Sequence, residues 1–476
     1  MAKVKVGLVG VYAGNFDLEA AERGYQDSIR GLQKLAQELD FELVAIPKGL
    51  GDVESCIAAR KQLEAKGVDF LLLQLSAFAA GEIVAVFADM GVRLGLWGVP
   101  EPAETGMLRL NSLCGVNLYA AILGTYLSER KVKFKWFFGR PEDELFQNRF
   151  RPTVAALKAI KALDGAKFAN IGGTPEGYYD VYWNDGRLRS KFNVIVRRHE
   201  LSEVFAIADK LSDAEVSKVA KEIMEEVPSK DITEREFKKL ARVYMAFERI
   251  IKDNEYTGVA IACWPQFQAA YGLAACTTLG RLNEKGYIAA CEGDIPSAVS
   301  MAIMKYMGEG KPVLMDLSKF DTQDDSILFW HCGVGHPSWG EKCIQCPHSI
   351  LKLPDETGKI KGAPAAYEMV FKPGLVTLMR LTDGGNRLLL VTGEVLKVQK
   401  PSVLGTRGWV GNLKLNGEEK ISALEFTNTV LVNGFEHHFP LARGDLSEAI
   451  LEFAAWLDIQ PLAKVPYRNY LQVRAW

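Results

Sequence analysis

Three side chains that commonly bind metal ions follow predicted strands in the second half of the chain. Glu292 comes directly after the apolar run GYIAAC, Asp316 follows KPVLM, and His331 follows SILFW. Ligands of open α/β sheets bind beyond the carboxyl ends of the strands, so three consecutive strands that end in this way would deliver these side chains to one place. Two carboxylates and an imidazole suit a divalent ion such as Mn²⁺, with coordination positions left open for substrate oxygens.

Each of these residues also has a purely structural interpretation. An acid after a strand often caps the next helix, and Asp294, which precedes the predicted helix IPSAVSMAIMKYM, is expected to be only a cap. Capping does not explain why Glu292 comes before the cap, nor why a histidine ends the third strand. The three residues taken together therefore favour a metal site.

A second group of potential ligands lies a little further along the chain. Cys343 and Cys346 form a C-x₂-C pair, and Cys332, His336 and His348 are close in sequence. The usual zinc signature needs a second ligand pair at suitable spacing, which these histidines would supply only if the fold brought them there. The sequence leaves open a structural zinc ion at Cys343 and Cys346, a solvent-facing or redox-inert loop, and a loop over the substrate pocket.

Two stretches of alternating strand and helix patterns would position the metal-binding candidates. The first runs from residue 3 to about 140 and the second from about 165 to 350, each with short apolar runs between helical segments. This alternation predicts βαβ units and parallel sheets. After residue 350, runs such as EMVFK, LVTLMRL, NRLLLVTGEVLKV and KISALEF are separated by turn signals. They indicate antiparallel strands in a sandwich or barrel, closed by one helix at about 446–458.

The predicted fold class is therefore α/β, with two doubly wound α/β domains that have parallel sheets, followed by a C-terminal antiparallel, β-rich, barrel-like domain. The domain limits predicted from these patterns are 1–165, 166–350 and 351–476. A length of 476 residues agrees with about three domains. The central domain would carry the acids of the metal site.

Composition and charge narrow the class of protein. The 48% of hydrophobic and 24% of charged residues are typical of a globular protein. The 57 Lys and Arg against 59 Asp and Glu give no global charge that would attract nucleic acid or an anionic membrane. The N-terminus reads as a buried strand, VKVGLVG, rather than a signal peptide, and no run reaches the ~20 apolar residues of a membrane span. We therefore expect a cytoplasmic protein.

Four motifs in the second half of the chain, CEGDIPSAVSMAIMKYM, VLMD, FWHCG and NGFEHH, resemble in sequence and order the metal-site elements of the L-fucose isomerase / L-arabinose isomerase superfamily. The resemblance implies an Mn²⁺-dependent enzyme that interconverts an aldose and a ketose. It implies that Glu292 and Asp316 bind the metal and serve as the acid–base pair. In arabinose isomerases a histidine follows the second acid, and His331 occupies that place as a metal ligand or as a donor to a substrate oxygen.

The same resemblance implies a metal-binding histidine late in the chain, but its register is ambiguous. The family has one residue fewer between the glycine and the histidine pair than Gly434-Phe435-Glu436-His437-His438 has. Matching the second histidine of the pair favours His438, whereas counting from the glycine favours His437.

Resemblance in the first domain is weaker and concerns substrate binding. The segment LRLNSLCGVN resembles one that reaches a neighbouring subunit's active site in this family, which implies a role for Asn111 and Ser112, although a helix cap explains both equally well. Asn15 occupies the place of a substrate-facing turn, although a plain tight turn suffices. Trp264 follows the strand TGVAIAC, and it would either stack on a sugar or be buried at a helix start. The family forms trimers or hexamers, so a homo-oligomer with its active site near a subunit interface is implied.

The implied chemistry agrees with the implied ligands. Aldose–ketose isomerisation moves a proton between C1 and C2 through an enediol, which requires a base and polarisation of the O1 and O2 oxygens. A metal ion that bridges both oxygens supplies the polarisation and orients the open-chain sugar. L-Fucose, D-arabinose, L-arabinose and a modified hexose all remain open as substrates. The alternative is a non-catalytic sugar-binding protein built on the same α/β domains, which would not need this set of metal-binding side chains.

Overall fold

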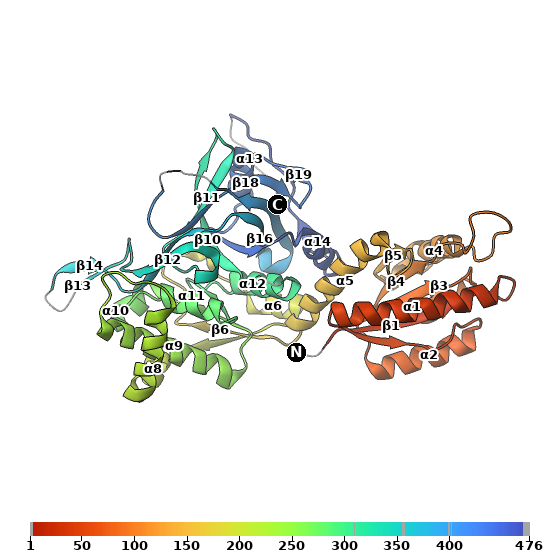
Figure 1. The fold of residues 1–476 in the computed structure, drawn as a ribbon, viewed down its shortest axis with the longest axis horizontal. Coiled ribbons are helices and arrows are strands. Elements are labelled where there is room, and N and C mark those ends of the chain that lie inside the picture. The colour runs from red at the N-terminus through yellow and green to blue at the C-terminus, as the bar shows by residue number, and fades with distance from the viewer. Residues whose placement is uncertain (1–2, 309, 355–357, 398–399, 401, 470–476) are drawn as a thin grey trace. The chain divides into compact units, whose positions relative to one another are not determined.

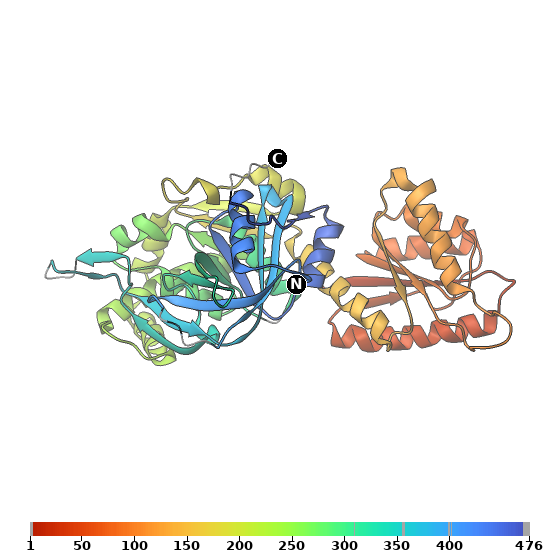
Figure 2. The same ribbon diagram turned by 90° about the horizontal axis from the view of Figure 1, so that it is seen from above.

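A computed structural model describes residues 3–308, 310–354, 358–397, 400 and 402–469, and the chain divides into two compact units, Met1–Lys161 and Ala162–Trp476 (Figure 1). Each unit has its own sheets and its own core, and the turned view of Figure 2 shows the helices on both faces of the first unit's sheet. In the described part of the chain, no helix has the length and apolar character needed to cross a lipid bilayer.

The first unit is built on a parallel sheet of five strands in the order β2-β1-β3-β4-β5. Its middle strand, FLLLQL, is buried along its whole length, as expected for a sheet covered on both faces. Leu73 faces α2, α3 and α4 in one core. The next residue points the other way, and Gln74 bonds to Ser28 of α1, while Trp97 packs on Phe146 of α5. The strands are β1 (Lys5–Val11), β2 (Glu42–Ala45), β3 (Phe70–Leu75), β4 (Arg93–Gly98) and β5 (Phe134–Phe138), and the helices are α1 (Leu18–Glu38), α2 (Val53–Lys66), α3 (Glu82–Ala88), α4 (Ser112–Ala121) and α5 (Glu144–Leu163).

The second unit contains a parallel sheet of four strands in the order β7-β6-β8-β9. Helix α12 follows β9 and lies between this sheet and the strands β16 and β20 of a larger sheet (Figure 1). It is buried from Ile295 to Met304 except at Pro296, since it is covered from two sides. The strands are β6 (Lys167–Ile171), β7 (Ile195–His199), β8 (Gly258–Ile261) and β9 (Ile288–Ala290), and the helices are α6 (Asp185–Phe192), α7 (Leu201–Asp209), α8 (Asp213–Glu226), α9 (Glu234–Asn254), α10 (Gln268–Tyr271), α11 (Cys276–Glu284) and α12 (Ile295–Met307).

The larger sheet of the second unit has ten strands and closes on itself. Strands β18, β11, β10, β20, β16 and β17 follow one another around a ring of antiparallel pairs, because β17 also pairs with β18. The closed antiparallel barrel and the two parallel sheets confirm the predicted fold class. The elements are β10 (Val313–Asp321), β11 (Ser326–His331), β12 (Gly340–Cys346), β13 (Lys352–Pro354), β14 (Ile360–Gly362), β15 (Ala366–Phe371), β16 (Gly374–Thr382), β17 (Arg387–Val395), β18 (Thr406–Leu415), β19 (Glu419–Lys420), α13 (Ala423–Val432), β20 (His438–Arg443), α14 (Ser447–Trp456) and β21 (Gln460–Pro461).

Two local predictions within this region are wrong. Strands β10 and β11 were expected to end in a parallel sheet, but they form an antiparallel hairpin of the barrel, because only residues 322–325 connect them and a parallel pair needs a long crossover. The run KISALEF was expected to be a strand, but α13 begins within it, because Ser422 and Glu425 form a capping box. The three predicted domain ranges stay predictions, since the second compact unit includes both the four-stranded sheet and the barrel.

Candidate metal centre and active site

Four candidate metal ligands of the second unit meet where α12 and the barrel come together. Glu292 follows β9, Asp316 lies within β10, His331 ends β11, and His438 begins β20. Asp316 and His438 are direct partners across the antiparallel pair β10–β20. Nε2 of His438 lies 3.7 Å from Oε2 of Glu292 and 3.8 Å from Oδ1 of Asp316, and the rings of His331 and His438 are 5.7 Å apart. The structure thus brings these four residues together.

Three atoms of this group are buried and have no hydrogen-bond partner. They are Oδ1 of Asp316, Nε2 of His331 and Nε2 of His438, and one ligand atom from each of these three residues lies within 4.8 Å of the others. One buried polar atom without a partner costs about 1–3 kcal/mol, so three at one point need a common partner. A carboxylate oxygen and two imidazole nitrogens are ligands of a borderline divalent ion, so these residues fit a bound metal.

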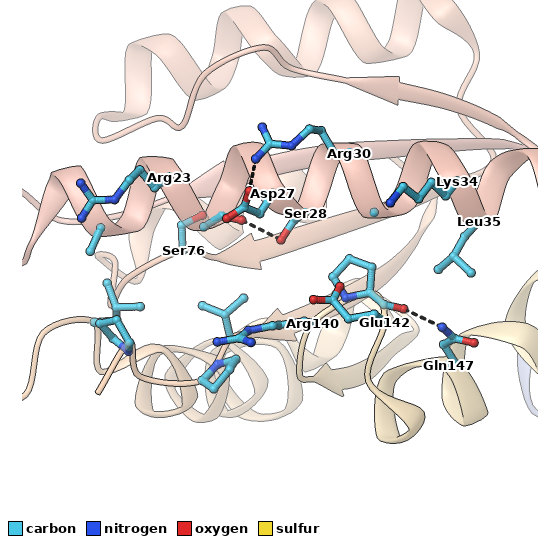
Figure 3. A pocket seen from close by; sticks show the side chains of 18 of the residues that line it. Arg23, Asp27, Ser28, Arg30, Lys34, Leu35, Ser76, Arg140, Glu142 and Gln147 are labelled. Carbon is cyan, nitrogen blue, oxygen red and sulfur yellow. Dashed lines mark hydrogen bonds and ion pairs between the residues drawn. The ribbon is translucent and has the colours of Figure 1, made fainter. Parts of the chain in front are cut away.

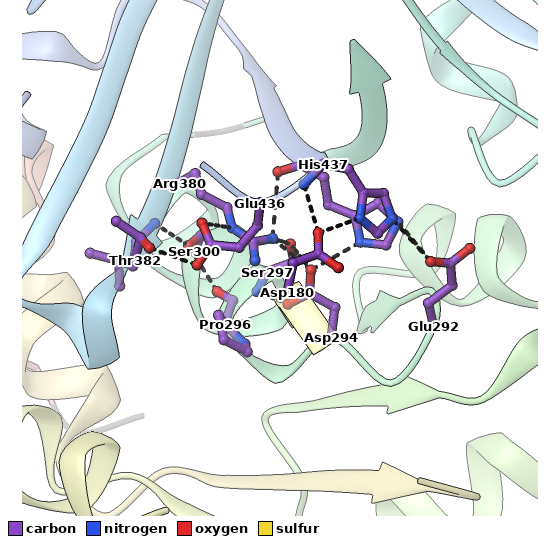
Figure 4. Close-up of polar contacts among 12 residues, drawn as sticks. Asp180, Glu292, Asp294, Pro296, Ser297, Ser300, Arg380, Thr382, Glu436 and His437 are labelled. Atoms are coloured by element: carbon purple, nitrogen blue, oxygen red, sulfur yellow. Dashed lines mark hydrogen bonds and ion pairs between the residues drawn. The ribbon is translucent and has the colours of Figure 1, made fainter. Parts of the chain in front are cut away.

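A buried carboxylate orients the histidine of β20. Nδ1 of His438 lies 2.9 Å from Oδ2 of Asp294, which is labelled among its polar contacts in Figure 4. The bond places the ring proton on Nδ1 and leaves the Nε2 lone pair free, 3.8 Å from Oδ1 of Asp316. Burial raises the pKa of Asp294, but the charge of Arg380, whose Nη1 lies 2.6 Å away, and the bond with His438 outweigh it, so the pKa lies well below its usual range. Asp294 does cap α12 through the backbone N–H of Ser297, but the expectation that it is only a cap is wrong.

The neighbouring histidine has a different environment. His437 is 38% exposed, and its Nδ1 lies 2.6 Å from Oδ2 of Asp180 while its Nε2 lies 3.1 Å from Oε2 of Glu292. Burial lowers the pKa of His437, but the hydrogen bonds to Glu292 and Asp180 outweigh it and raise the pKa to about 9. His437 and His438 also form a group with Glu292 whose ligand atoms lie within 4.8 Å. Both ring nitrogens of His437 are engaged by carboxylates, whereas Nε2 of His438 has no hydrogen-bond partner.

The backbone around Glu292 is held in an unusual conformation. Glu292 and Gly293 both have positive φ, of 57° and 70°. A Cβ at Gly293 would lie 2.1 Å from the carbonyl oxygen of Gly173, so only glycine fits there. Burial raises the pKa of Glu292, but the hydrogen bond from His437 and the nearby imidazoles outweigh it, and the pKa falls below its usual value. The carboxylate is therefore ionised and aimed into the site.

His331 has two chemical roles open to it. The backbone N–H of Cys332 donates to its Nδ1 over 2.8 Å, and Sγ of Cys332 lies 3.2 Å from the same atom. With Nδ1 as an acceptor, the neutral ring carries its proton on Nε2 and can donate it to an oxygen in the site. Binding a metal through Nε2 requires the proton to leave that atom.

Aromatic side chains line one side of the site. The ring of Trp264, which lies in the short helical segment Cys263–Phe267 after β8, is 5.6 Å from that of Tyr178, and Tyr178 is 5.8 Å from the ring of His437. Trp264 is partly exposed, so it is available to a ligand rather than enclosed at a helix start. A partly exposed indole beside a polar site is a common surface for sugar binding.

Two polar residues of the site were missed from the sequence. Asp180 lies in the loop after β6, beyond the carboxyl end of a parallel strand. This position, where open α/β sheets bind ligands, was the signal in the sequence. Arg380 lies within β16, fully buried, and also has an ion pair of 3.5 Å between its Nε and Oε2 of Glu436. A single arginine inside the apolar run LVTLMRL was its signal, since buried charges require partners.

The candidates of the first unit lie at the carboxyl ends of its strands. Asn15 is exposed in the turn after β1, and Asn111 precedes α4 with a φ of 51° and no side-chain capping bond. Ser112 is buried, and its hydroxyl accepts from Val99 and donates to the carbonyl of Leu75.

A cavity of about 870 Å³ lies beside α1 of the first unit (Figure 3). Its lining includes Ser76, Arg140 and Lys34. None of the three first-unit candidates Asn15, Asn111 and Ser112 lines this cavity.

The proposed zinc ligands lie apart from the metal centre. Cys343 and Cys346 are on β12, where they pair with Met369 and Ala366 of β15. Among the described residues, neither belongs to a group of three metal-ligand atoms within 4.8 Å. His336 uses both nitrogens, with Glu284 and the carbonyl of Lys311 at 3.0 and 3.2 Å. A zinc ion at Cys343 and Cys346 stays a prediction.

Comparisons with known proteins point to sugar isomerases. The family model for the L-arabinose isomerase central domain matches residues 187–310. Sulfoquinovose isomerases from Priestia aryabhattai and Priestia megaterium are each 28% identical over 469 residues, covering 97% of this chain and 99% of theirs. The sulfoquinovose isomerase of Clostridium sp. (strain MSTE9) is 27% identical over 472 residues, with the same coverage.

Among solved structures, a D-allose-bound solute-binding protein from Actinobacillus succinogenes matches 64% of this chain and 92% of its own at 11% identity. Its TM-score of 0.18 is too low to indicate a shared fold.

Fold, site and relatives together define an enzyme that interconverts an aldose and a ketose. The resemblance to the L-arabinose/L-fucose isomerase superfamily that the sequence motifs indicate is confirmed by the family-model match and by these relatives. The enzyme predicted from the sequence is confirmed, and the non-catalytic alternative is not supported.

Proposed function

We propose that the chain converts sulfoquinovose, a hexose with a sulfonate group, to its ketose in an Mn²⁺-dependent reaction on the open-chain sugar. Relatives that carry this activity in their names match 97% of the chain, which supports the substrate, a modified hexose and thus one of the four substrates that the sequence leaves open. The observation that carries the metal dependence is the set of three buried, unpartnered atoms on Asp316, His331 and His438.

The proposed metal ligands are Glu292, Asp316 and His438, with His331 as a fourth ligand or as a donor to a substrate oxygen. His438 is preferred to His437 because only its Nε2 lacks a hydrogen-bond partner. When bound, Mn²⁺ would polarise the sugar oxygens O1 and O2 as charge develops on them.

The protein's own carboxylates would move the proton. Glu292 is ionised, as a general base must be, and Asp316 approaches the same nitrogen of His438, at 3.8 Å against 3.7 Å for Glu292, so one carboxylate would remove a proton from the sugar while the other returns it. Oε2 of Glu292 accepts from Nε2 of His437, which Asp180 holds in turn, so this carboxylate is fixed in direction.

Substrate binding is proposed for Trp264, which would stack on the sugar face, and for Asn15, Asn111 and Ser112 of the first unit. The hydroxyl of Ser112 bonds to the last residue of β3 and to the residue after β4, so it would act by holding Asn111 in place. A cytoplasmic location and a trimer or hexamer with the active site near a subunit interface complete the proposal.

The test is ketose formation from a panel of aldoses with added Mn²⁺. Sulfoquinovose should be converted at least about tenfold faster, by kcat/KM, than the same sugar without its sulfonate, L-fucose, D-arabinose or L-arabinose. Glu292→Gln should abolish ketose formation while the circular dichroism spectrum is unchanged, and Glu225→Gln on the exposed side of α8 is the matched control. Equal turnover of the sulfonated and unsulfonated sugars would reject the substrate, and near-normal turnover by Glu292→Gln would reject the site.

A further inference from the structure

A second cluster of reactive side chains adjoins the metal centre, because one of its residues, Cys332, directly follows His331 and contacts its ring. Cys276 is the first residue of α11, Cys332 follows β11, and His348 lies between β12 and β13. The two sulfur atoms are 3.8 Å apart, and one ligand atom from each of the three residues lies within 4.8 Å of the others. Cys276 and His348 are each 2% exposed, whereas Cys332 is partly exposed.

The hydrogen bonds of His348 favour a thiol site over a metal site at this cluster. Its Nδ1 accepts backbone N–H bonds from Ile350 and Leu351, over 3.0 and 2.8 Å, so the ring proton is on Nε2. Nε2 is buried without a hydrogen-bond partner. In this tautomer Nε2 can donate a hydrogen bond to a sulfur atom, and a metal could bind there only after the proton leaves Nε2.

Cys332 connects this cluster to the metal centre. Its Sγ lies 3.2 Å from Nδ1 of His331, and its backbone N–H donates to the same atom. The other nitrogen of that ring is one of the three unpartnered atoms of the metal centre. A change in the position of this sulfur therefore reaches His331 directly.

From this geometry we infer that Cys276 and Cys332 are a redox-sensitive dithiol, which hydrogen peroxide or a similar small oxidant converts to a disulfide that weakens metal binding. The thiolate of Cys276 attacks peroxide and becomes a sulfenic acid, and the sulfur of Cys332 then displaces the hydroxyl group as the S–S bond forms. The two thiols lose two electrons and two protons, and peroxide becomes two molecules of water. A dithiol reductant reverses the step.

The disulfide pulls Sγ of Cys332 towards α11 and away from His331. The ring of His331 then loses its contact with this sulfur, shifts in the site, and weakens metal binding. The effect on the metal rests on the function proposed above, whereas formation of the disulfide does not.

The experiment treats the full-length protein with hydrogen peroxide and maps the cysteines by peptide mass spectrometry. The expected result is one cross-linked peptide pair joining residues 276 and 332, a loss of at least tenfold in Mn²⁺ affinity by calorimetry, and recovery of both with dithiothreitol. Cys276→Ser should form no cross-link and keep its affinity after peroxide. Cys114→Ser, which changes an exposed thiol on α4, should behave like the unchanged protein.

Three results would overturn the inference. One is a cross-link between Cys263 and Cys291, whose sulfur atoms are 2.7 Å apart, in place of the pair 276 and 332. Another is stoichiometric zinc on the untreated thiols, and the third is a 276–332 cross-link that leaves Mn²⁺ affinity unchanged. If Cys276→Ser fails to fold, Cys276→Ala and the peptide map of the unchanged protein decide the question. The peptide map needs neither substrate nor metal, so its failure is distinguishable from failure of the proposed function.

Discussion

Replacing Asp294 by asparagine tests whether this buried carboxylate orients the histidine that faces the metal centre. In the structure Oδ2 of Asp294 receives bonds from Nδ1 of His438 at 2.9 Å, Oγ of Ser297 at 2.8 Å and Nη1 of Arg380 at 2.6 Å. Asparagine has one acceptor oxygen for these donors and no charge. If the amide N–H₂ of the asparagine faces Nδ1 of His438, the ring proton is no longer held on Nδ1. If it faces Arg380 instead, two donor groups meet there without an acceptor between them.

The size of the effect follows from two separate losses. Outer-shell partners of metal-binding histidines are typically worth about 10- to 100-fold in metal affinity, which is about 1.4–2.8 kcal/mol. Breaking a buried ion pair costs about 3–5 kcal/mol of stability, and the remaining ion pair of Arg380 with Glu436, at 3.5 Å, places the expected loss near the lower end, about 3 kcal/mol. The two losses appear in different measurements.

The assay is calorimetric titration of metal-free protein with Mn²⁺, with urea unfolding alongside. Asp294→Asn should bind Mn²⁺ about 10- to 100-fold more weakly. Ser297→Ala is the matched control, because it removes the hydroxyl's bonds to Asp294 and from Arg380 but leaves the charge of Asp294 and its bond to His438, so it should lose only about 2 kcal/mol of stability. If Asp294→Asn folds and binds Mn²⁺ within twofold of the unchanged protein, the carboxylate does not orient His438 for metal binding.

Three further predictions concern the same site. His438→Asn should lower Mn²⁺ affinity at least about 100-fold while His437→Asn lowers it far less, as measured by calorimetry, and equal losses would contradict the assignment of His438. Trp264→Ala should raise KM for the sugar about 2- to 10-fold with little change in kcat, Trp136→Ala being the control, and an unchanged KM would remove Trp264 from the substrate site. Because the pKa of His437 is raised from 6.5 to about 9 in the folded protein, its contribution to the free energy of unfolding is complete below pH 6.5 and is lost as the pH rises through 9. Urea unfolding of metal-free protein at both ends of that range should therefore show a decline that His437→Gln reduces, and an equal decline in the variant would refute this origin.

Much of the candidate site could be predicted because its residues follow apolar runs. Glu292 and His331 each end a buried stretch, and the position of the histidine pair near the C-terminus agreed with a known family pattern. The choice between His437 and His438 could not be made from spacing, since it depends on which ring meets Asp294 and which meets Asp180. Those contacts join residues 144 and 257 positions apart.

The sequence did not show whether strands β10 and β11 are parallel or antiparallel. Asp316 was predicted at the end of a parallel strand, yet β10 continues to Asp321 and turns back at once into β11. Apolar runs of this length look the same in parallel and antiparallel sheets, and only the four-residue connection distinguishes them. Asp316 still reaches the site because β20 brings His438 opposite to it.

The most direct measurement is turnover of sulfoquinovose by protein freed of metal with a chelator and then titrated with Mn²⁺. The geometry of Glu292, Asp316, His331 and His438 predicts no ketose before the ion is added, and a rate that rises to a plateau at one Mn²⁺ per chain. Full turnover in the presence of chelator, or no turnover at any Mn²⁺ concentration, would contradict an Mn²⁺-dependent isomerase at this site.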